Sequence, residues 1–234
     1  NSNYTFFVDS TAPLISFTDP TLPTNTNLSR SNLFVNVSVT ELNEANITFY
    51  LYNSTGLHNS SFFSSARREL NFTSLPDGIY TYNVTVFDIL HNSNSTQTRQ
   101  ITLDTTAPNA TLLTPVNNTI TSTTQQNLSV NITDNLGVDN ITLFVFNQTN
   151  DLINQTTQFV SGTTQTLIGI VYTFLTDGIF HLFYEAIDIA DNKIISSNNT
   201  ITIDTTTSLI EFVSPTPSNN TAFTRTDIFL NVSV

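Results

Sequence analysis

The sequence predicts an all-β protein made of tandem two-layer β-sandwich domains, each with about seven antiparallel strands. First, a six-residue phrase recurs after 95 and then 100 residues, as VDSTAP at 8–13, LDTTAP at 103–108 and IDTTTS at 203–208. A repeat of this length is a domain, because solenoid units span only about 20–50 residues. Second, apolar and polar residues alternate within each repeat. Third, the chain is rich in strand formers (42 Thr, 18 Phe) and in turn formers (30 Asn, 23 Ser).

Alternation with a period of two predicts the strands in turn. The segment YTYNVTV at 80–86 places Tyr and Val on one face and Thr and Asn on the other, and the segments 33–39, 46–51 and 128–132 alternate likewise. Turn residues separate such segments every ~8–12 positions, which is the spacing typical of a sandwich. In the first repeat we expect strands near 13–18, 31–40, 45–53, 57–63, 67–73, 78–88 and 95–103. We expect seven in the second repeat as well.

The segment DGIYTY at 77–82 is a specific local motif. It resembles the D-G-x-Y-x-C corner of immunoglobulin-like domains, in which the Tyr hydroxyl bonds back to the backbone and a core residue follows two positions later. Tyr82 stands in the place of the Cys, so an apolar pair would replace the inter-sheet disulfide. In the second repeat Phe180 and Leu182 take these places, so the corner should lack the hydroxyl bond and be weaker there.

The corner combines with a strand end of the form F/I-D-x-x-x-N and with the D-T-T-A-P linker. This combination is similar to tandem bacterial and archaeal immunoglobulin-like repeats of large cell-surface proteins. The resemblance implies one such domain over 9–103 and another over 104–203. Residues 1–8 would be the closing strand of a preceding domain, and 204–234 the first strands of a following or subunit-shared one.

The two end segments leave two interpretations open. Either the chain is cut from a longer array, or its end strands complete domains in neighbouring subunits, because an unpaired strand can extend another sheet edge. The linker itself is short, and Pro108 fixes one of its backbone angles. We therefore expect neighbouring domains to be stiffly oriented, and the junction at Ser208 to be looser.

Composition excludes several function classes. The net charge is −12, with six Lys and Arg against 18 Asp and Glu, which argues against nucleic-acid partners and a polybasic membrane patch. No apolar run approaches the ~18 residues of a membrane span in this segment. The absence of Cys removes disulfides, thiolate zinc sites and thiol catalysis.

Nineteen of the 30 Asn begin an Asn-x-Ser/Thr triplet, more than twice the number that random placement of Ser and Thr would give. Strand alternation explains nine of these triplets but not the ten in turns or with polar, small or aromatic middle residues. Asn is also a poor strand former, so N-linked glycans at the surface are the better explanation. Heavy sequon loading with few Lys resembles archaeal more than bacterial surface proteins. The predicted sites are Asn3, Asn27, Asn36, Asn46, Asn53, Asn59, Asn71, Asn83, Asn94, Asn109, Asn117, Asn127, Asn131, Asn140, Asn147, Asn154, Asn198, Asn219 and Asn231.

One end of the second repeat should gather acidic and amide side chains, because the chain start, the B–C loop and the F–G loop of such a sandwich meet there. Calcium takes six to eight oxygen ligands, so a calcium site between domains is a hypothesis for this end. The alternative is that Asp and Asn simply form turns. The candidate ligands are Asp104, Asp134, Asp139, Asp188 and Asp191, with Asn135 and Asn192 beside them. The first repeat offers a thinner set, namely Asp9, Glu41, Glu44 and Asp88.

Catalysis has no support in the sequence. His58, His91 and His181 lie in unrelated contexts, and neither G-x-S-x-G nor H-E-x-x-H occurs. Apart from calcium, we expect no cofactor. Aromatic pairs at 50/52 and 144/146 fall on the outward phase of equivalent strands, which indicates a lateral contact, a sugar-covered surface or cover from a neighbouring strand.

These observations favour a non-enzymatic extracellular structural protein, a glycosylated immunoglobulin-like stalk or filament subunit on a cell surface. It would self-associate into a fibre or belong to a longer array. An adhesin whose loops or outward aromatics bind a host or partner molecule is the alternative. An accessory array of a carbohydrate-active enzyme is a third.

Overall fold

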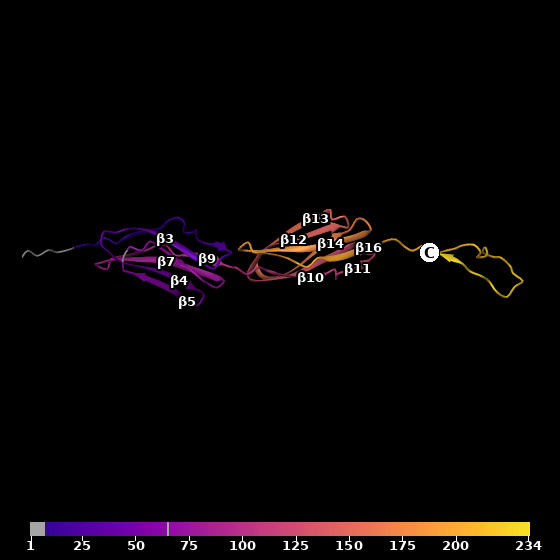
Figure 1. Cartoon of the computed structure of the whole chain (residues 1–234), viewed down its shortest axis with the longest axis horizontal. Helices are drawn as coiled ribbons and strands as arrows, with labels where there is room; N and C mark the ends of the chain where they lie inside the picture. Colours follow the sequence, from indigo (N-terminus) through magenta and orange to yellow (C-terminus); the bar gives the residue numbers. More distant parts are fainter. Residues whose placement is uncertain (1–7, 65) are drawn as a thin grey trace, which may run out of the picture.

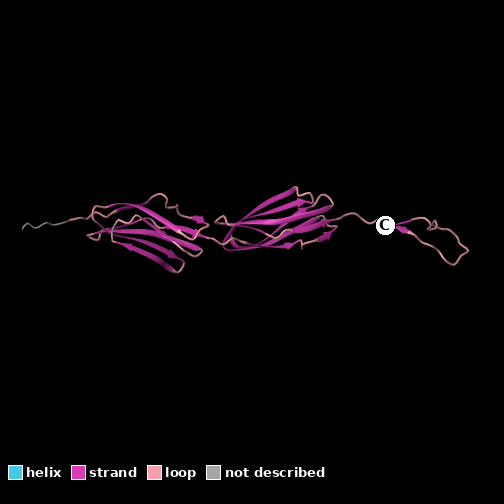
Figure 2. Cartoon of the chain, in the orientation of Figure 1, coloured by secondary structure: helices cyan, strands magenta, loops and turns pink. Residues whose placement is uncertain are grey.

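The computed structural model describes residues 8–64 and 66–234, and these residues form strands and loops without a helix. The predicted all-β fold class is confirmed. Two β-sandwiches follow one another along the long axis of the molecule, and a C-terminal segment lies beyond them (Figures 1 and 2). Apart from Val8, the closing strand expected over 1–8 lies outside the described residues. Among the described residues, no helix is long and apolar enough to cross a membrane.

The first sandwich consists of a three-stranded sheet in the order β1-β3-β6 and a second sheet in the order β2-β9-β7-β4-β5, with β8 beside β7. Its strands are β1 (Leu14–Phe17), β2 (Thr26–Leu28), β3 (Leu33–Thr40), β4 (Glu44–Asn53), β5 (Gly56–Phe63), β6 (Glu69–Phe72), β7 (Gly78–Asp88), β8 (Ser93–Ser95) and β9 (Arg99–Leu103). All pairs are antiparallel except β2 with β9.

Two details of the first sandwich differ from the expectation. The strand expected over 95–103 is interrupted, because Thr96 turns inward and its hydroxyl accepts a hydrogen bond from the Val84 amide at 3.0 Å. The short strand β2 was not predicted. It covers only three residues and pairs in parallel with β9, so it has no alternation long enough to detect.

Alternation places the core where the sequence predicts it. Along β7 every second residue is buried, and these residues pack against inward side chains of β3 in the facing sheet and of β4 in the same sheet. Tyr82 and its counterpart Leu182 are both fully buried, as expected for residues that each take the place of the corner Cys in their own sandwich. Each sandwich has its own hydrophobic core, so each is stabilised largely by its own apolar burial.

The second sandwich contains seven strands, as expected, but two of them are much longer than any strand of the first sandwich. Its strands are β10 (Asn109–Thr114), β11 (Thr119–Thr121), β12 (Gln125–Asn147), β13 (Leu152–Thr173), β14 (Gly178–Asp188), β15 (Lys193–Ile195) and β16 (Asn199–Ile203). They form one sheet in the order β10-β12-β14-β16-β11, with β13 beside β12 and β15 beside β14.

Two strands, β12 and β13, run through both layers of the second sandwich. The first half of β12 pairs with β10 and the second half with β14, while β13 follows it throughout. The crossing is made at Gly137, whose φ is 151°, where the pairing register shifts. A Cβ there would lie 2.5 Å from the carbonyl oxygen of Gly162, so only glycine permits this close approach. This bulge replaces the loop that separates β3 from β4 in the first sandwich.

The C-terminal segment contains β17 (Glu211–Phe212) and β18 (Val232–Ser233). Phe212 pairs with Val232 just as Phe17 pairs with Val37 in the first sandwich. The Thr216 hydroxyl donates to the Asn231 carbonyl at 2.7 Å, which repeats the contact of Thr21 with Asn36 at 2.8 Å. The register of β1 and β3 is thus repeated after the second sandwich.

Candidate functional site at the junction of the two sandwiches

The corner predicted at the start of β7 is present. The Tyr80 hydroxyl donates to the carbonyl oxygen of Pro76 at 2.8 Å, which confirms the bond back to the backbone. At the equivalent position Phe180 is buried and has no hydroxyl to donate. The corner of the second sandwich therefore keeps the packing and loses the hydrogen bond.

The acidic residue of this corner holds the linker that follows the first sandwich. Asp77 Oδ1 accepts hydrogen bonds from the Thr105 amide and hydroxyl, both at 2.9 Å, and its Oδ2 accepts one from the Thr106 hydroxyl at 2.6 Å. Burial alone would raise the pKa of Asp77, but the bonds from Thr106 and Thr105 lower it below its ordinary value. We call this arrangement the linker clamp.

The linker clamp recurs at the end of the second sandwich. Asp177 Oδ1 accepts from the Thr205 amide at 3.0 Å and from its hydroxyl at 2.8 Å, and Oδ2 accepts from the Thr206 hydroxyl at 3.0 Å. The bonds from Thr205 lower the pKa of Asp177. Sequence reasoning used Asp77 only as part of the corner and missed its role toward the linker. The joint recurrence of D-G and D-T-T, 100 residues apart, was the signal that could have found it.

Three carboxylates from separate parts of the chain meet on the second-sandwich side of the junction. Asp104 follows β9, Asp134 lies in β12, and Asp188 ends β14. One oxygen from each lies within 4.8 Å of the others. Asp104 is 0% and Asp188 1% exposed. We call these residues the acidic cluster.

Two oxygens of the acidic cluster have no partner. Asp104 Oδ2 and Asp134 Oδ2 are buried and accept no hydrogen bond from the described residues. Burial first, and then the charges of Asp134 and Asp188, raise the pKa of Asp104. Within the described part of the chain the sole ion pair is between Arg68 and Glu44, so no cationic side chain pairs with the cluster. Concentrated negative charge without a counter-ion is the electrostatic condition of a cation site.

Both carboxylate oxygens of Asp188 accept hydrogen bonds within the turn after β14. Its Oδ1 accepts from the amides of Ala190 at 2.8 Å and Asn192 at 2.9 Å, and its Oδ2 accepts from Asn192 Nδ2 at 2.7 Å. Asn192 Nδ2 also donates to the carbonyl oxygen of Asp104 at 2.9 Å. This explains the D-x-x-x-N strand end: the Asp forms the turn and the Asn connects it to the linker.

Asn135 connects the two sandwiches directly. Its Nδ2 donates to Asp77 Oδ2 at 3.3 Å and to Asp104 Oδ1 at 3.2 Å, so it joins the linker clamp to the acidic cluster. The next residue, Leu136, lines a shallow hollow beside Pro76 and Ile79 of the first sandwich. The Ser29 hydroxyl also donates to Asn192 Oδ1 across the junction.

The structure narrows the predicted set of cation ligands. Asp104, Asp134 and Asp188 come together, with Asn135 and Asn192 beside them. The other two predicted ligands, Asp139 and Asp191, lie outside this group of three. Asp139 accepts a hydrogen bond from its neighbour Asn140, and Asp191 is exposed at a turn position with φ of 68°. Nearness in sequence to the loop did not imply that these two side chains face inward.

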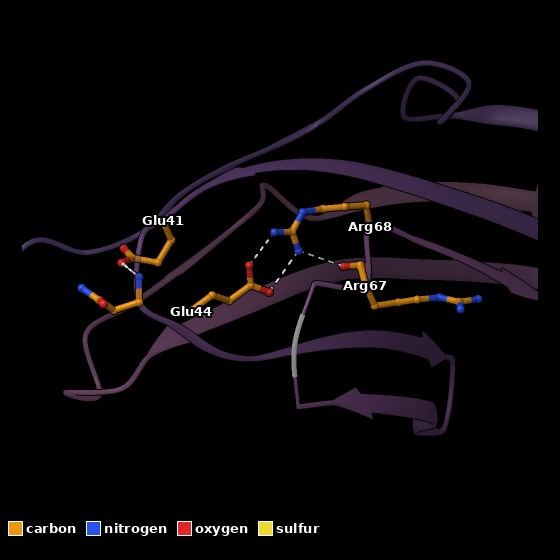
Figure 3. A network of polar contacts seen from close by, with 5 residues as sticks. Glu41, Glu44, Arg67 and Arg68 are labelled. Carbon is orange, nitrogen blue, oxygen red and sulfur yellow. Dashed lines mark hydrogen bonds and ion pairs between the residues drawn. The ribbon is translucent and has the colours of Figure 1, made fainter.

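The thinner set expected in the first sandwich does not form a cluster. Glu44 accepts two hydrogen bonds from Arg68, at 3.0 and 2.5 Å. Figure 3 shows this pair. Glu41 accepts from the Asn43 amide, and Asp88 organises the turn that corresponds to that of Asp188. Asp9 accepts from the Thr11 amide. Within the described residues, the single group of three carboxylates is the one at the junction.

The sequon asparagines lie at the surface. Asn3 is outside the described residues, and none of the other 18 is buried. Nine are fully exposed, namely Asn27, Asn59, Asn71, Asn94, Asn109, Asn117, Asn127, Asn198 and Asn219. By contrast, Asn199, which begins no sequon, is buried and donates to the Pro115 carbonyl at 2.8 Å. Burial of the whole residue therefore excludes none of the described sequons from carrying a sugar.

The predicted outward aromatic residues are partly covered by other aromatic rings. Tyr50 stacks on Tyr52, and Phe144 and Phe146 both stack on Phe183, which leaves these rings half-buried on the outer sheet face. The predicted outward orientation is confirmed, and the neighbouring strand supplies part of the cover in the second sandwich.

The three histidines lie at a sheet edge, in a turn and on an outer face: His58, His91 and His181.

No protein-family model matches the sequence, and no curated protein matches it. Among solved structures, a marsupial T cell receptor aligns with a TM-score of 0.51 at 10% identity, over 88% of this chain and 78% of that one. A tetra-tandem repeat from the extending region of a large adhesion protein aligns with a TM-score of 0.46 at 21% identity, over 88% and 53%. Fibronectin(III)-like modules of CbhA from Clostridium thermocellum align with a TM-score of 0.35 at 13% identity, over 81% and 93%. At 10% identity the likeness to the T cell receptor shows the fold alone, which is an immunoglobulin-like sandwich.

Proposed function

We propose that this chain is a non-enzymatic, extracellular extension module, a glycosylated stalk or filament subunit of a cell surface. The observation that carries the proposal is the linker clamp, which holds the exit linker of each sandwich against its own corner. A clamp at both exits sets the direction in which the next part of the chain leaves. A protein built for reach needs that property, because free linkers would let the sandwiches fold back on one another.

The first junction has further restraints. Asn135 bonds to both sides, Leu136 packs beside the first corner, and the buried Pro108 fixes one linker angle. The contacts of these two neighbouring residues, together with the fixed linker angle, oppose bending at the junction. The arrangement supports a semi-rigid rod in preference to a flexible string of domains.

The sequons support an extracellular setting. Eighteen described asparagines are accessible in a chain that carries a single Lys, so sugars would supply the surface polarity that charged residues usually give. The proposal includes two further points: the high density of sequons is of the archaeal type, and the chain self-associates into a fibre.

We also propose that the acidic cluster binds calcium. Asp104, Asp134 and Asp188 offer oxygen ligands, and two of these oxygens lack any other partner. Calcium accepts irregular oxygen sets, whereas Mg²⁺ demands near-octahedral geometry and keeps its waters. A cation here would bind where the linker enters the second sandwich and would stiffen the same junction. Calorimetric titration of the full chain with CaCl₂ tests this role, and the absence of binding at millimolar calcium would refute it.

The stalk proposal is tested by negative-stain electron microscopy of the purified full chain, with the distribution of angles between the two sandwiches as the measurement. A narrow distribution, with or without end-to-end polymers, is expected. A broad distribution would contradict the role as an extension module. Isolated rods that bind a partner molecule through the outward aromatics would favour an adhesin instead.

A further inference from the structure

The long strand β13 is an edge strand that exposes apolar side chains. Within the described residues it pairs only with β12, along most of its 22 residues. Its three most exposed large apolar residues are Phe159, Leu167 and Val171, which are 75%, 66% and 66% exposed. An exposed edge with apolar side chains can pair with another chain and lead to aggregation. With one Lys in the whole chain, the usual protective charge is scarce.

Each of these three residues lies directly opposite a sequon asparagine on β12. The pairs are Asn140 with Phe159, Asn131 with Leu167, and Asn127 with Val171. Residues paired in this way point to the same face of an antiparallel sheet, with Cβ atoms about 4.5–5.5 Å apart. A sugar attached to the asparagine therefore begins beside the apolar side chain.

The side chain of Asn127 lies against Gly169 of β13, where any larger residue would displace it. A Cβ on Gly169 would lie 2.7 Å from Asn127 Oδ1, so the amide rests over the glycine backbone. Leu167 and Val171 stand two residues to either side of Gly169, on the same exposed face. The amide is thus held between the two apolar side chains that a sugar would cover.

The pairing recurs in the first sandwich, where the opposite residues are aromatic. Asn71 pairs with Phe34, Asn83 with Tyr50, and Asn46 with Phe87. All three aromatic residues are only half-buried. Asn27, Asn36 and Asn53 are exceptions, because they pair with Thr102, Glu69 and Gly56. The coincidence therefore extends over both sandwiches and is not a peculiarity of one strand.

We propose that N-linked sugars on Asn127, Asn131 and Asn140 lie across Val171, Leu167 and Phe159 and protect the β13 edge from association. The inference rests on the glycosylation part of the proposed function. The apolar C–H face of the first sugar contacts the side chain, and its hydroxyl groups face water. The glycosylated amide keeps one N–H, so Asn140 retains a donor for its 3.0 Å bond to Asp139. The sugar replaces the edge charge used elsewhere.

The test uses the full chain secreted from a eukaryotic host that adds N-linked sugars. One variant combines Asn127→Gln, Asn131→Gln and Asn140→Gln. The matched control combines Asn27→Gln, Asn109→Gln and Asn198→Gln, which are exposed sequons without a large apolar residue paired opposite. Glycopeptide mass spectrometry gives the occupancy, and the fluorescence of the apolar probe ANS with light scattering gives the exposed apolar surface.

The first variant should bind about twofold or more ANS relative to wild type and scatter more light, while the control changes little. Adding Phe159→Ser, Leu167→Thr and Val171→Thr to the first variant should restore the wild-type signals. Enzymatic removal of sugars from folded wild type should reproduce the first variant, which guards against a folding defect. Equal ANS signals in both variants, with occupied sites in wild type, would overturn the inference and leave the glycosylated stalk intact. The inference would also be overturned if wild type carried no sugar on Asn127, Asn131 and Asn140. The glycosylation part of the proposed function would be removed as well only if no sequon of the chain carried a sugar.

Discussion

Asn135 of the second sandwich donates a hydrogen bond to Asp77 of the first at 3.3 Å. The same nitrogen donates to Asp104 at 3.2 Å, so one side chain joins the corner, the linker and the acidic cluster. The orientation of the two sandwiches thus depends on a small number of polar contacts that substitution can remove one at a time.

Removing the first linker clamp should loosen the junction. Asp77→Ala deletes the acceptor for Thr105, Thr106 and Asn135. We expect a wider range of angles between the sandwiches, measured by small-angle scattering or electron microscopy, without unfolding of either. Asp177→Ala is the matched control, since it removes the same clamp after the second sandwich and should leave that range unchanged. A junction as narrow in Asp77→Ala as in wild type would count against the clamp.

The second clamp should open in acid. The pKa of Asp177 is lowered by its bonds to Thr205, so the carboxylate form is the one that the folded clamp favours. Its contribution is present above the ordinary pKa near 3.8 and is lost as the pH falls through the lower folded value. The amide signal of Thr205 in NMR spectra should shift in that acidic window. Asp177→Asn should abolish the transition, and persistence of the shift in this variant would assign it to another group.

Calcium should stabilise the second sandwich more than the first. Binding to the folded state alone adds about 2.7 kcal/mol when the calcium concentration is roughly 100 times Kd. We expect calcium to raise, and a chelator to lower, the melting temperature of the second sandwich. Asp134→Asn should abolish this difference. Asp151→Asn, which changes an exposed carboxylate outside the acidic cluster, should preserve it.

The corner hydroxyl should have a measurable effect on the first sandwich. Tyr80→Phe removes the 2.8 Å bond to Pro76 and creates the corner that Phe180 already forms in the second sandwich. We expect a loss of about 1 kcal/mol in the free energy of unfolding, the typical net value of one hydrogen bond. The control is Tyr50→Phe, at a half-exposed ring on β4, and should cost less in denaturant titrations. Equal costs would show that the Tyr80 bond contributes nothing.

The glycine at the layer crossing should tolerate no side chain. Gly137→Ala places a Cβ 2.5 Å from the Gly162 carbonyl and also strains a backbone with φ of 151°. Gly56→Ala is a useful comparison, because Gly56 has φ of 119° and open space around it. Backbone strain of this kind costs about 1–3 kcal/mol. Gly137→Ala should therefore lower the unfolding free energy by more than Gly56→Ala does. If the two variants lost the same free energy, backbone strain alone would explain the effect and the close contact with Gly162 would contribute nothing.

The strands of the first sandwich could be predicted because alternation decides which side chains are buried. The residues 80, 82, 84 and 86 are inside, and the polar residues between them are not. The merged strands β12 and β13 could not be predicted, since their continuity depends on the contact between Gly137 and Gly162, far apart in sequence. The residues around each of these glycines do not distinguish it, in the sequence, from a glycine in an ordinary turn.

The candidate site was predictable in part. Chain topology brings Asp104, Asp134 and Asp188 together, because Asp104 follows β9, Asp188 ends β14, and Asp134 lies where β12 crosses between the layers. Topology does not fix the direction of a side chain within a turn, and for that reason the sequence could not show that Asp139 and Asp191 lie outside the acidic cluster. The role of Asp77 required knowledge that the linker folds back onto the corner, which is a tertiary contact.

The continuity of β12 and β13 gives the two sandwiches different susceptibility to proteases. The first sandwich has a connection between β5 and β6 that carries Arg67 and Arg68, two adjacent cleavage points for trypsin. In the second sandwich the corresponding connection is absorbed into β13, and Lys193 is the one Lys or Arg between 104 and 203. Limited digestion should therefore nick the first sandwich early and leave the second largely uncut.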